Sequence, residues 1–190
     1  MLLAIDTSAG TGVAVVDGGR VLAEAAEAGT RRHAEAIGTL IAAALAEAGV
    51  APGQLDGVVA GMGPGPFTGL RVGIAAARAF AFARGIPLHP MVSHDAVAFG
   101  QPDRVVVVTD ARRREVAWSL YDPGLTRLDG PHLAERDGFA APADARRIDA
   151  AEISAAALGL AAEHLLAAGR ELGPDQPLYL RAPDVTVMPR

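Results

Sequence analysis

The sequence predicts an α/β fold built from two related lobes. The first observation is an apolar run at Leu2 to Ile5 that is followed by Asp6, a polar turn and a second apolar run. The second is that the same order returns after Val105, with Asp110 in the place of Asp6. The third is that helix-forming sequence follows each copy, as in folds where helices cover a sheet. A repeated unit of this kind indicates a duplicated fold.

The composition is that of a globular protein, with 190 residues of which 51% are apolar and 21% charged. A net charge of -5 argues against a chain that wraps nucleic acid by itself, since that role needs a basic face. The absence of cysteine excludes disulfides and thiolate metal sites. No basic region precedes the first apolar residues, and no predicted helix is long and apolar enough to span a bilayer. We therefore expect a soluble, cytoplasmic protein that does not bind membranes.

The first part of the chain favours a meander of three strands and then a helix. The apolar runs that predict the strands lie at Leu2 to Ile5, Val13 to Val16 and Val21 to Ala25. The step Asp17-Gly18-Gly19 has the residue types of a tight hairpin turn. Apolar residues then recur at helical spacing, so we expect a helix with Thr30 as its N-cap that ends near Ala48, before Gly49.

The rest of the first lobe, which we expect over residues 1–102, alternates strands and helices. These elements are a strand at Val58 to Ala60, a helix from about Gly69 to Arg84, a strand at Leu88 to Val92 and a helix at Asp95 to Phe99. A glycine run, Gly61 to Arg71, joins the first two of them, and Thr68 is placed to cap the helix. Gly85 is the expected helix stop.

The second lobe, expected over residues 103–190, is smaller. Its first strands are predicted at Val105 to Val108 and Val116 to Asp122. Residues Ala134 to Asp149 have little periodicity and are expected to be mostly loop, before a last helix from Ala151 to Ala168. Two strand-Asp-turn-strand units suggest lobes of the actin and ribonuclease H kind. The predicted fold class is therefore α/β with duplicated actin-like, ribonuclease H-like lobes (the ASKHA superfold), the second of them shortened.

Three segments resemble one known family. The loop GPGPFTGLR from Gly63 to Arg71 resembles the GPGSFTGLR signature of the TsaB (YeaZ) family, the opening LLAIDTS resembles its first strand and turn, and DARRREVAW from Asp110 to Trp118 resembles a segment of its second lobe. The tail Tyr179 to Arg181 agrees as well, so the resemblance spans almost the whole chain. A nine-residue loop signature is far more specific than a lone glycine pattern.

This resemblance implies a non-catalytic, activating subunit in bacterial tRNA threonylcarbamoyladenosine synthesis. The implied partners are a TsaD-like catalytic subunit and a TsaE-like ATPase, with ATP and a metal ion only on those partners and contact with tRNA only indirect. Threonylcarbamoyl would go to N6 of adenosine 37 in tRNAs that read ANN codons. Two alternatives stay open. One is an autonomous enzyme of the same superfold, a small kinase or a metallopeptidase, and the other is a homodimer that only self-associates.

A nucleotide site would use the turns after the first strand of each lobe together with the glycine run. The weak candidates are Asp6, Thr7, Ser8, Gly63, Gly65 and Thr68. In the second lobe Arg112 stands where such a turn needs glycine, and Pro66 replaces the family serine, which removes both a hydroxyl and an N–H. We therefore expect weak or no nucleotide binding by the isolated chain.

The five histidines do not pair at the helical spacing of a metal site. Catalytic relatives of the TsaD type use a His-x-x-x-His helix to bind a metal, and here His33 is followed by Ile37 in the second ligand position. A surface or capping contact is the expected role of His33. No metal site and no catalytic residue is predicted.

Two apolar helices are the predicted partner surface. Gly69, Gly73, Ala77 and Ala81 recur every four residues, which suits either a seat in the chain's own core or a partner-facing surface. A four-helix interface with a second subunit, including a homodimer when the chain is alone, would follow from the second alternative. The predicted interface residues are Gly69, Arg71, Val72, Gly73, Ala75, Ala76, Ala77, Arg78, Ile37 and Ile41.

Overall fold

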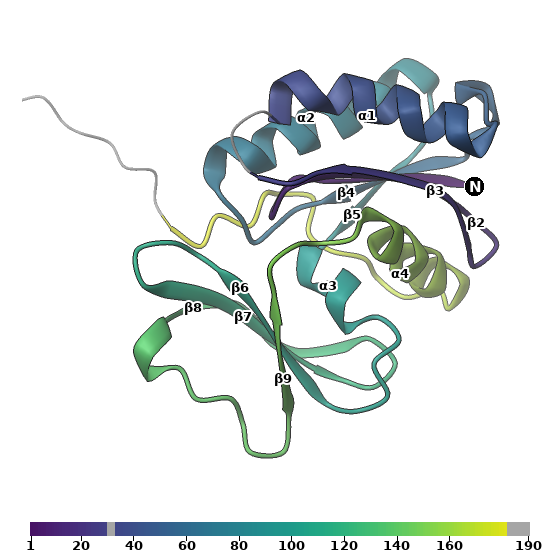
Figure 1. Ribbon diagram of the computed structural model, residues 1–190. Coiled ribbons are helices and arrows are strands. Elements are labelled where there is room, and N and C mark those ends of the chain that lie inside the picture. Colours follow the sequence, from purple (N-terminus) through teal and green to yellow (C-terminus); the bar gives the residue numbers. More distant parts are fainter. Residues whose placement is uncertain (30–32, 182–190) are drawn as a thin grey trace, which may run out of the picture.

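The computed structural model describes residues 1–29 and 33–181, and two β-sheets organise them (Figure 1). The strands of the first sheet are β1 (Leu2–Asp6), β2 (Thr11–Asp17), β3 (Arg20–Glu27), β4 (Gly57–Gly61) and β5 (Leu88–Met91). They lie in the order β3-β2-β1-β4-β5, with β1, β2 and β3 antiparallel and β4 and β5 parallel to β1. The predicted meander and its hairpin turn, where Asp17 pairs with Arg20, are confirmed.

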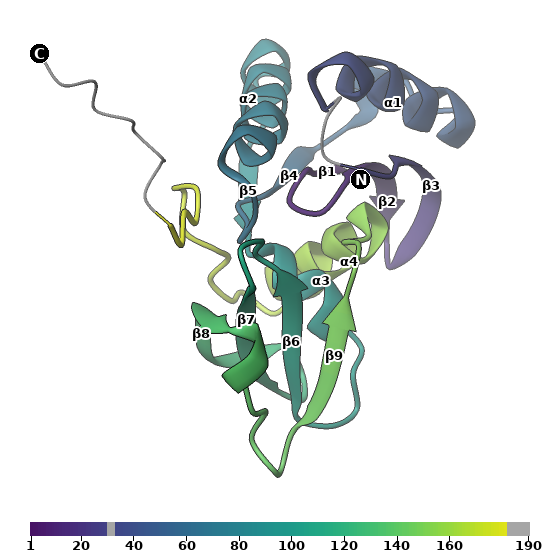
Figure 2. The same cartoon turned by 60° about the vertical axis from the view of Figure 1, so that its left-hand side comes forward.

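Helices cover both faces of the first sheet, because alternate residues of its strands are buried on opposite sides. Leu3 and Ile5 of β1 belong to the core under α1 (His33–Ala48) and α2 (Phe67–Arg84), whereas Leu2 and Ala4 belong to the core under α4 (Ala155–Ala167). Figure 2 shows α1 and α2 together on one side of the sheet and α4 on the other. The predicted N-cap Thr30 lies outside the described residues.

The second sheet repeats the first with one strand fewer. Its strands are β6 (Val105–Asp110), β7 (Glu115–Asp122), β8 (Thr126–Glu135) and β9 (Arg146–Ala150). The order β8-β7-β6-β9, with β9 parallel to β6, matches β3-β2-β1-β4 of the first sheet. Within the described residues no strand corresponds to β5, and the one-turn 3-10 helix η2 (Arg136–Gly138) stands where the first half has α1. The duplicated, ASKHA-type α/β fold with a shortened second lobe is therefore confirmed.

The prediction of mostly loop from Ala134 to Asp149 holds only for residues 139–145, because β8 reaches Glu135, η2 follows it, and β9 begins at Arg146. The sequence of β9, Arg-Arg-Ile-Asp-Ala, has one large apolar residue and reads as polar. It forms an edge strand that pairs only with β6, from Val105↔Arg146 to Thr109↔Ala150. Pairing with a buried neighbour, not local propensity, makes this segment a strand.

One core joins the two halves. It combines residues of the first sheet, residues of the second sheet such as Val107 and Tyr121, and residues of α3 (Ser93–Ala98) and α4. The last helix starts at Ala155, four residues after the predicted start, because the hydroxyl of Ser154 caps it by accepting from the N–H of Ala157 at 3.0 Å. Similarly, α3 starts two residues before the predicted Asp95. None of the described helices is long and apolar enough to cross a membrane.

Candidate functional site

The glycine run forms a tight loop between β4 and α2, and α2 begins at Phe67, two residues earlier than predicted. Pro66 occupies the N-cap with φ -62° and has no side-chain cap to offer. The prediction that Thr68 caps the helix is therefore wrong, since Thr68 is an exposed residue of the first helical turn. Proline fixes the backbone at the helix entry in place of a hydrogen-bonding cap.

The glycines of the loop allow close approach between β1 and α2. A Cβ on Gly65 would lie 2.8 Å from the Cα of Ser8. Gly63 has φ +96°, and its Cβ would lie 2.9 Å from Leu70 Cδ1. Gly65 therefore needs glycine for packing, and Gly63 needs it for both packing and backbone conformation, whether or not an anion binds.

The turn after β1 is buried beneath this loop. Asp6 Oδ1 accepts hydrogen bonds from the Ser8 N–H at 2.8 Å and the Ser8 hydroxyl at 2.6 Å, and the Thr7 hydroxyl donates to the Gly69 carbonyl at 2.8 Å. Asp6 is 2% exposed, and burial raises the pKa of its carboxyl although hydrogen bonds from Ser8 and Ser93 act the other way. The side chains that a nucleotide site would use are thus engaged inside the fold.

His33 is buried, so the predicted surface or capping role is wrong. Its Nδ1 lies 2.7 Å from the Thr11 hydroxyl, while Nε2 has no hydrogen-bond partner within the described part of the chain. Burial lowers the pKa of His33, which favours the neutral ring. A Cβ on Gly69 would lie 2.9 Å from Nε2, so the imidazole fills the space beneath the start of α2. Sequence patterns gave no signal for this contact.

A cavity of about 1010 Å³ separates the glycine loop from the second lobe. Ser8, Gly65 and Thr68 line it, so three of the six nucleotide candidates meet there, together with Arg112 and Arg113 from the turn between β6 and β7. Among the described residues, no three His, Asp or Glu side chains gather in a way that could hold a metal ion. The lining combines these arginines with Asp110, whose carboxylate accepts a hydrogen bond from Arg136.

The predicted partner residues divide into two sets. Gly69, Gly73, Ala77 and Ile37 are buried, and a Cβ on Gly73 would lie 2.9 Å from Thr7 Cγ2. The row of small residues therefore packs in the chain's own core. This corrects the prediction that these residues form part of the partner interface. The residues that reach the surface are Arg71, Ala75 and Arg78, with Val72, Ala76 and Ile41 half-buried.

Two surface features of α2 were not predicted. Phe82 is 90% exposed on the same helix as Ala75. The second feature is the segment from Asp175 to Tyr179, which lies along the helix. The Arg71 guanidinium stacks 3.8 Å from the Phe67 ring and donates to the Tyr179 hydroxyl at 3.1 Å, and Arg78 bonds Asp175 at 2.9 Å. An isolated phenylalanine in an Ala-rich helix is a weak signal, because core and surface aromatics look alike in sequence.

Comparison with known proteins places the chain in a family. The family model for tRNA N6-adenosine threonylcarbamoyltransferase, TsaD, matches residues 20–171. The structure of YeaZ from Pseudomonas aeruginosa superposes on 94% of this chain and 99% of that one, with a TM-score of 0.77 and 27% identity. The chain belongs to the TsaB (YeaZ) branch of the TsaD family.

Curated relatives match the chain over shorter spans, and one of them carries the TsaB name. The TsaB protein of Haemophilus influenzae is 37% identical over 98 residues, which are 49% of this chain and 42% of that protein. An uncharacterised protein of Mycobacterium tuberculosis is 48% identical over 111 residues, 58% of this chain and 52% of the relative. The chain thus spans about half the length of such curated relatives. The glycine loop with its buried Asp6 turn and the outer face of α2 are the candidate functional features of this TsaB-family chain.

Proposed function

We propose that the chain is a non-catalytic, activating subunit for the transfer of threonylcarbamoyl to N6 of adenosine 37 in tRNAs that read ANN codons. It pairs with a TsaD-like catalytic subunit, a TsaE-like ATPase joins them, and tRNA contacts this chain only indirectly. Family membership supports this role. The proposal also includes a homodimer when the partner is absent, and location in the cytoplasm.

The outer face of α2 carries this proposal. Phe82 is 90% exposed, and Ala79 and Ala75 are exposed one and two turns before it along the helix. Val72 and Ala76 extend the apolar stripe, while α1 lies beside it with half-buried Ile41 (Figure 2). A large exposed aromatic costs free energy in water unless a partner covers it. Apolar side chains exposed close together around it, with Arg78 among them, are typical of a protein interface. Small side chains around the phenylalanine allow a partner helix to approach closely.

The chemistry is proposed to take place on the partners. The acceptor atoms of Asp6 and the hydroxyl of Thr7 are used by hydrogen bonds inside the chain. Asp110, the matching acid of the second lobe, lines the cavity beside Arg112 and is paired with Arg136. ATP and a metal ion are accordingly assigned to the catalytic subunit and the ATPase. An autonomous kinase or metallopeptidase would need ligands that these residues do not supply.

The test mixes the chain with the TsaD-like protein of its own organism. Ala75→Glu places a longer, charged side chain in the exposed stripe between Arg71 and Arg78, where a contact would have to remove the carboxylate from water. We expect this variant to keep its circular dichroism spectrum, to elute separately from the partner on a sizing column, and to lose stimulation of tRNA modification. Ala167→Glu is the matched control, since Ala167 is an exposed alanine near the end of α4. Normal complex formation by Ala75→Glu would contradict the proposed surface, and modification by this chain alone would contradict the proposed role.

A further inference from the structure

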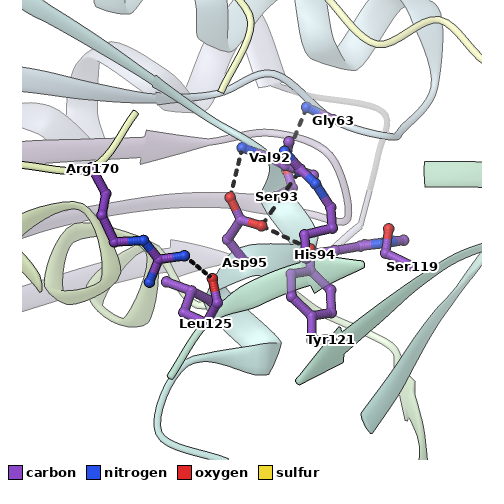
Figure 3. A network of polar contacts seen from close by, with 10 residues as sticks. Gly63, Val92, Ser93, His94, Asp95, Ser119, Tyr121, Leu125 and Arg170 are labelled. Carbon is purple, nitrogen blue, oxygen red and sulfur yellow. Dashed lines mark hydrogen bonds and ion pairs between the residues drawn. The ribbon is translucent and has the colours of Figure 1, made fainter. Parts of the chain in front are cut away.

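The first turn of α3 contacts both halves of the molecule (Figure 3). Its residues Ser93, His94 and Asp95 are polar, yet none is more than 5% exposed. Buried polar side chains need hydrogen-bond partners, and the partners of this turn lie in different sheets and loops. The turn belongs neither to the outer face of α2 nor to the lining of the cavity.

Ser93 holds the glycine loop. Its backbone N–H donates to the Gly63 carbonyl at 2.8 Å, and its hydroxyl accepts from the Gly63 N–H at 3.1 Å. The same hydroxyl donates to Asp6 Oδ2 at 2.5 Å. Both polar backbone groups of Gly63 are therefore fixed by one residue of α3, close to the point where α2 begins.

His94 and Asp95 hold the second sheet. The imidazole contacts one hydroxyl on each of two neighbouring strands. Its Nε2 lies 2.9 Å from the Thr109 hydroxyl of β6, and its Nδ1 lies 2.8 Å from the Ser119 hydroxyl of β7. Asp95 Oδ1 accepts from the Tyr121 hydroxyl at 2.7 Å, and the Arg127 guanidinium lies 3.5 Å away. Burial lowers the pKa of His94 to about 3, so the ring is neutral and donates on one side while it accepts on the other. Removing either hydroxyl leaves one ring nitrogen buried without a partner.

We propose that this turn is a positioning element. It fixes the position of the glycine loop and of the start of α2 relative to the second sheet. Residues 93–95 are consecutive in one short helix, so a shift of His94 also shifts Ser93 and with it Gly63. Thr109 and Ser119 are then positioning residues for the outer face of α2, which they do not touch, although Thr109 also lines the cavity that the glycine loop borders. Such coupling through a contiguous hydrogen-bonded network gives the second lobe a role in partner binding. This last consequence rests on the function proposed above.

The test compares two substitutions at one position. Thr109→Val keeps the shape of the side chain and removes the hydroxyl, whereas Thr109→Ser keeps the hydroxyl and removes a methyl group. Amide hydrogen exchange of the intact chain then reports on residues 61–70. We expect exchange there to be about tenfold faster in Thr109→Val and within about twofold of wild type in Thr109→Ser. If Thr109 acted through packing alone, exchange at residues 61–70 would be faster in Thr109→Ser, which loses a methyl group, than in Thr109→Val.

A control separates coupling from general loosening. Val116→Ala shortens a buried side chain on the other face of the same sheet, where Val106 and Val108 are its neighbours. It should speed exchange in the second sheet without changing residues 61–70. If Thr109→Val does not fold, Ser119→Ala removes the other hydroxyl and is used in the same comparison.

Partner binding provides the second measurement. Titration with the TsaD-like protein should show about tenfold weaker binding for Thr109→Val and little change for Thr109→Ser and Val116→Ala. Unchanged exchange at residues 61–70 in Thr109→Val would overturn the inference, as would equal effects of valine and serine. Failure of the wild-type chain to bind the partner would contradict the proposed function instead, and the exchange comparison would still decide the coupling.

Discussion

The carboxylate of Asp6 accepts a 2.5 Å hydrogen bond from the hydroxyl of Ser93, which follows it by 87 residues in the chain. This bond joins the end of β1 to the start of α3 beneath the glycine loop. A nucleotide site at this turn would need the carboxylate to face the ligand or its metal ion. Here it is used to hold the loop, which gives Asp6 a structural role with measurable consequences.

Asp6→Asn should change how stability depends on pH. Burial raises the pKa of Asp6 above its ordinary 3.8, so between that value and the raised pKa the folded state keeps a proton that the unfolded state has lost. The contribution of Asp6 to stability therefore falls as pH rises through this window. Urea unfolding at a series of pH values should show that the stability of Asp6→Asn, relative to that of the wild type, increases from pH 4 upward. A difference that shrinks with rising pH would show that the hydrogen bonds to the carboxylate outweigh burial.

His94→Asn should remove a pH dependence of the opposite sign. The pKa of His94 is lowered from 6.5 to about 3, so below pH 6.5 the unfolded state binds a proton that the folded state does not. Wild type should lose stability as pH falls from about 6.5 toward 3, by up to about 1.4 kcal/mol per pH unit from this residue. The variant should lack this slope in unfolding measurements. An identical slope in both proteins would mean that the histidine is protonated in the fold.

Two helical glycines should respond to alanine in opposite directions. Gly38 is exposed in α1 with open space around it, so Gly38→Ala should stabilise the protein by about 0.5–1 kcal/mol. A Cβ on Gly159 of α4 would lie 2.9 Å from Val16 Cγ2 in the first sheet. Gly159→Ala should therefore destabilise the protein by about 1–3 kcal/mol. Thermal unfolding compares the two directly, and stabilisation by both would place α4 farther from the sheet.

The isolated chain should bind ATP weakly or not at all in calorimetry with magnesium present. Pro66 lacks the N–H and hydroxyl that an anion-binding loop would use, and the polar groups of Thr7 and Ser8 are hydrogen-bonded within the fold. Pro66→Ser restores both missing groups and should remain a weak binder, because the buried turn is unchanged. Micromolar affinity of the wild-type chain would disprove this prediction.

Patterns that come from local physics were predictable from the sequence. Short apolar runs located β1, β2 and β4, and Gly85, with φ +66°, ends α2 as expected for a left-handed cap. The repeat around Asp6 and Asp110 gave the duplicated fold. Features that depend on distant partners were missed. β9 is a strand only because β6 pairs with it, and His33 is buried only because Gly69 leaves room beside it.

The outer face of α2 was predicted only in part, because the sequence does not show which distant segments a helix packs against. Helical spacing identifies which residues share a face, but it does not say which face meets the sheet. Gly73 and Ala75 looked equally suitable for a partner, and the structure places Gly73 against Thr7 and Ala75 in solvent. Domain boundaries at residue 102 stay a prediction. The last helix, α4, covers the first sheet although its sequence follows the second.

The segment along α2 sets an order of events during synthesis on the ribosome. The Leu178 N–H donates to the Met62 carbonyl at 2.8 Å, and Tyr179 stacks on Phe67 with ring centroids 4.8 Å apart. At translation rates of about 5–20 residues per second, the glycine loop emerges on the order of ten seconds before the residues that complete it. For most of that interval the first sheet lacks α4 on one face, and throughout it the start of α2 lacks its final cover. Nascent chains would therefore acquire a finished partner surface only when translation has passed Tyr179.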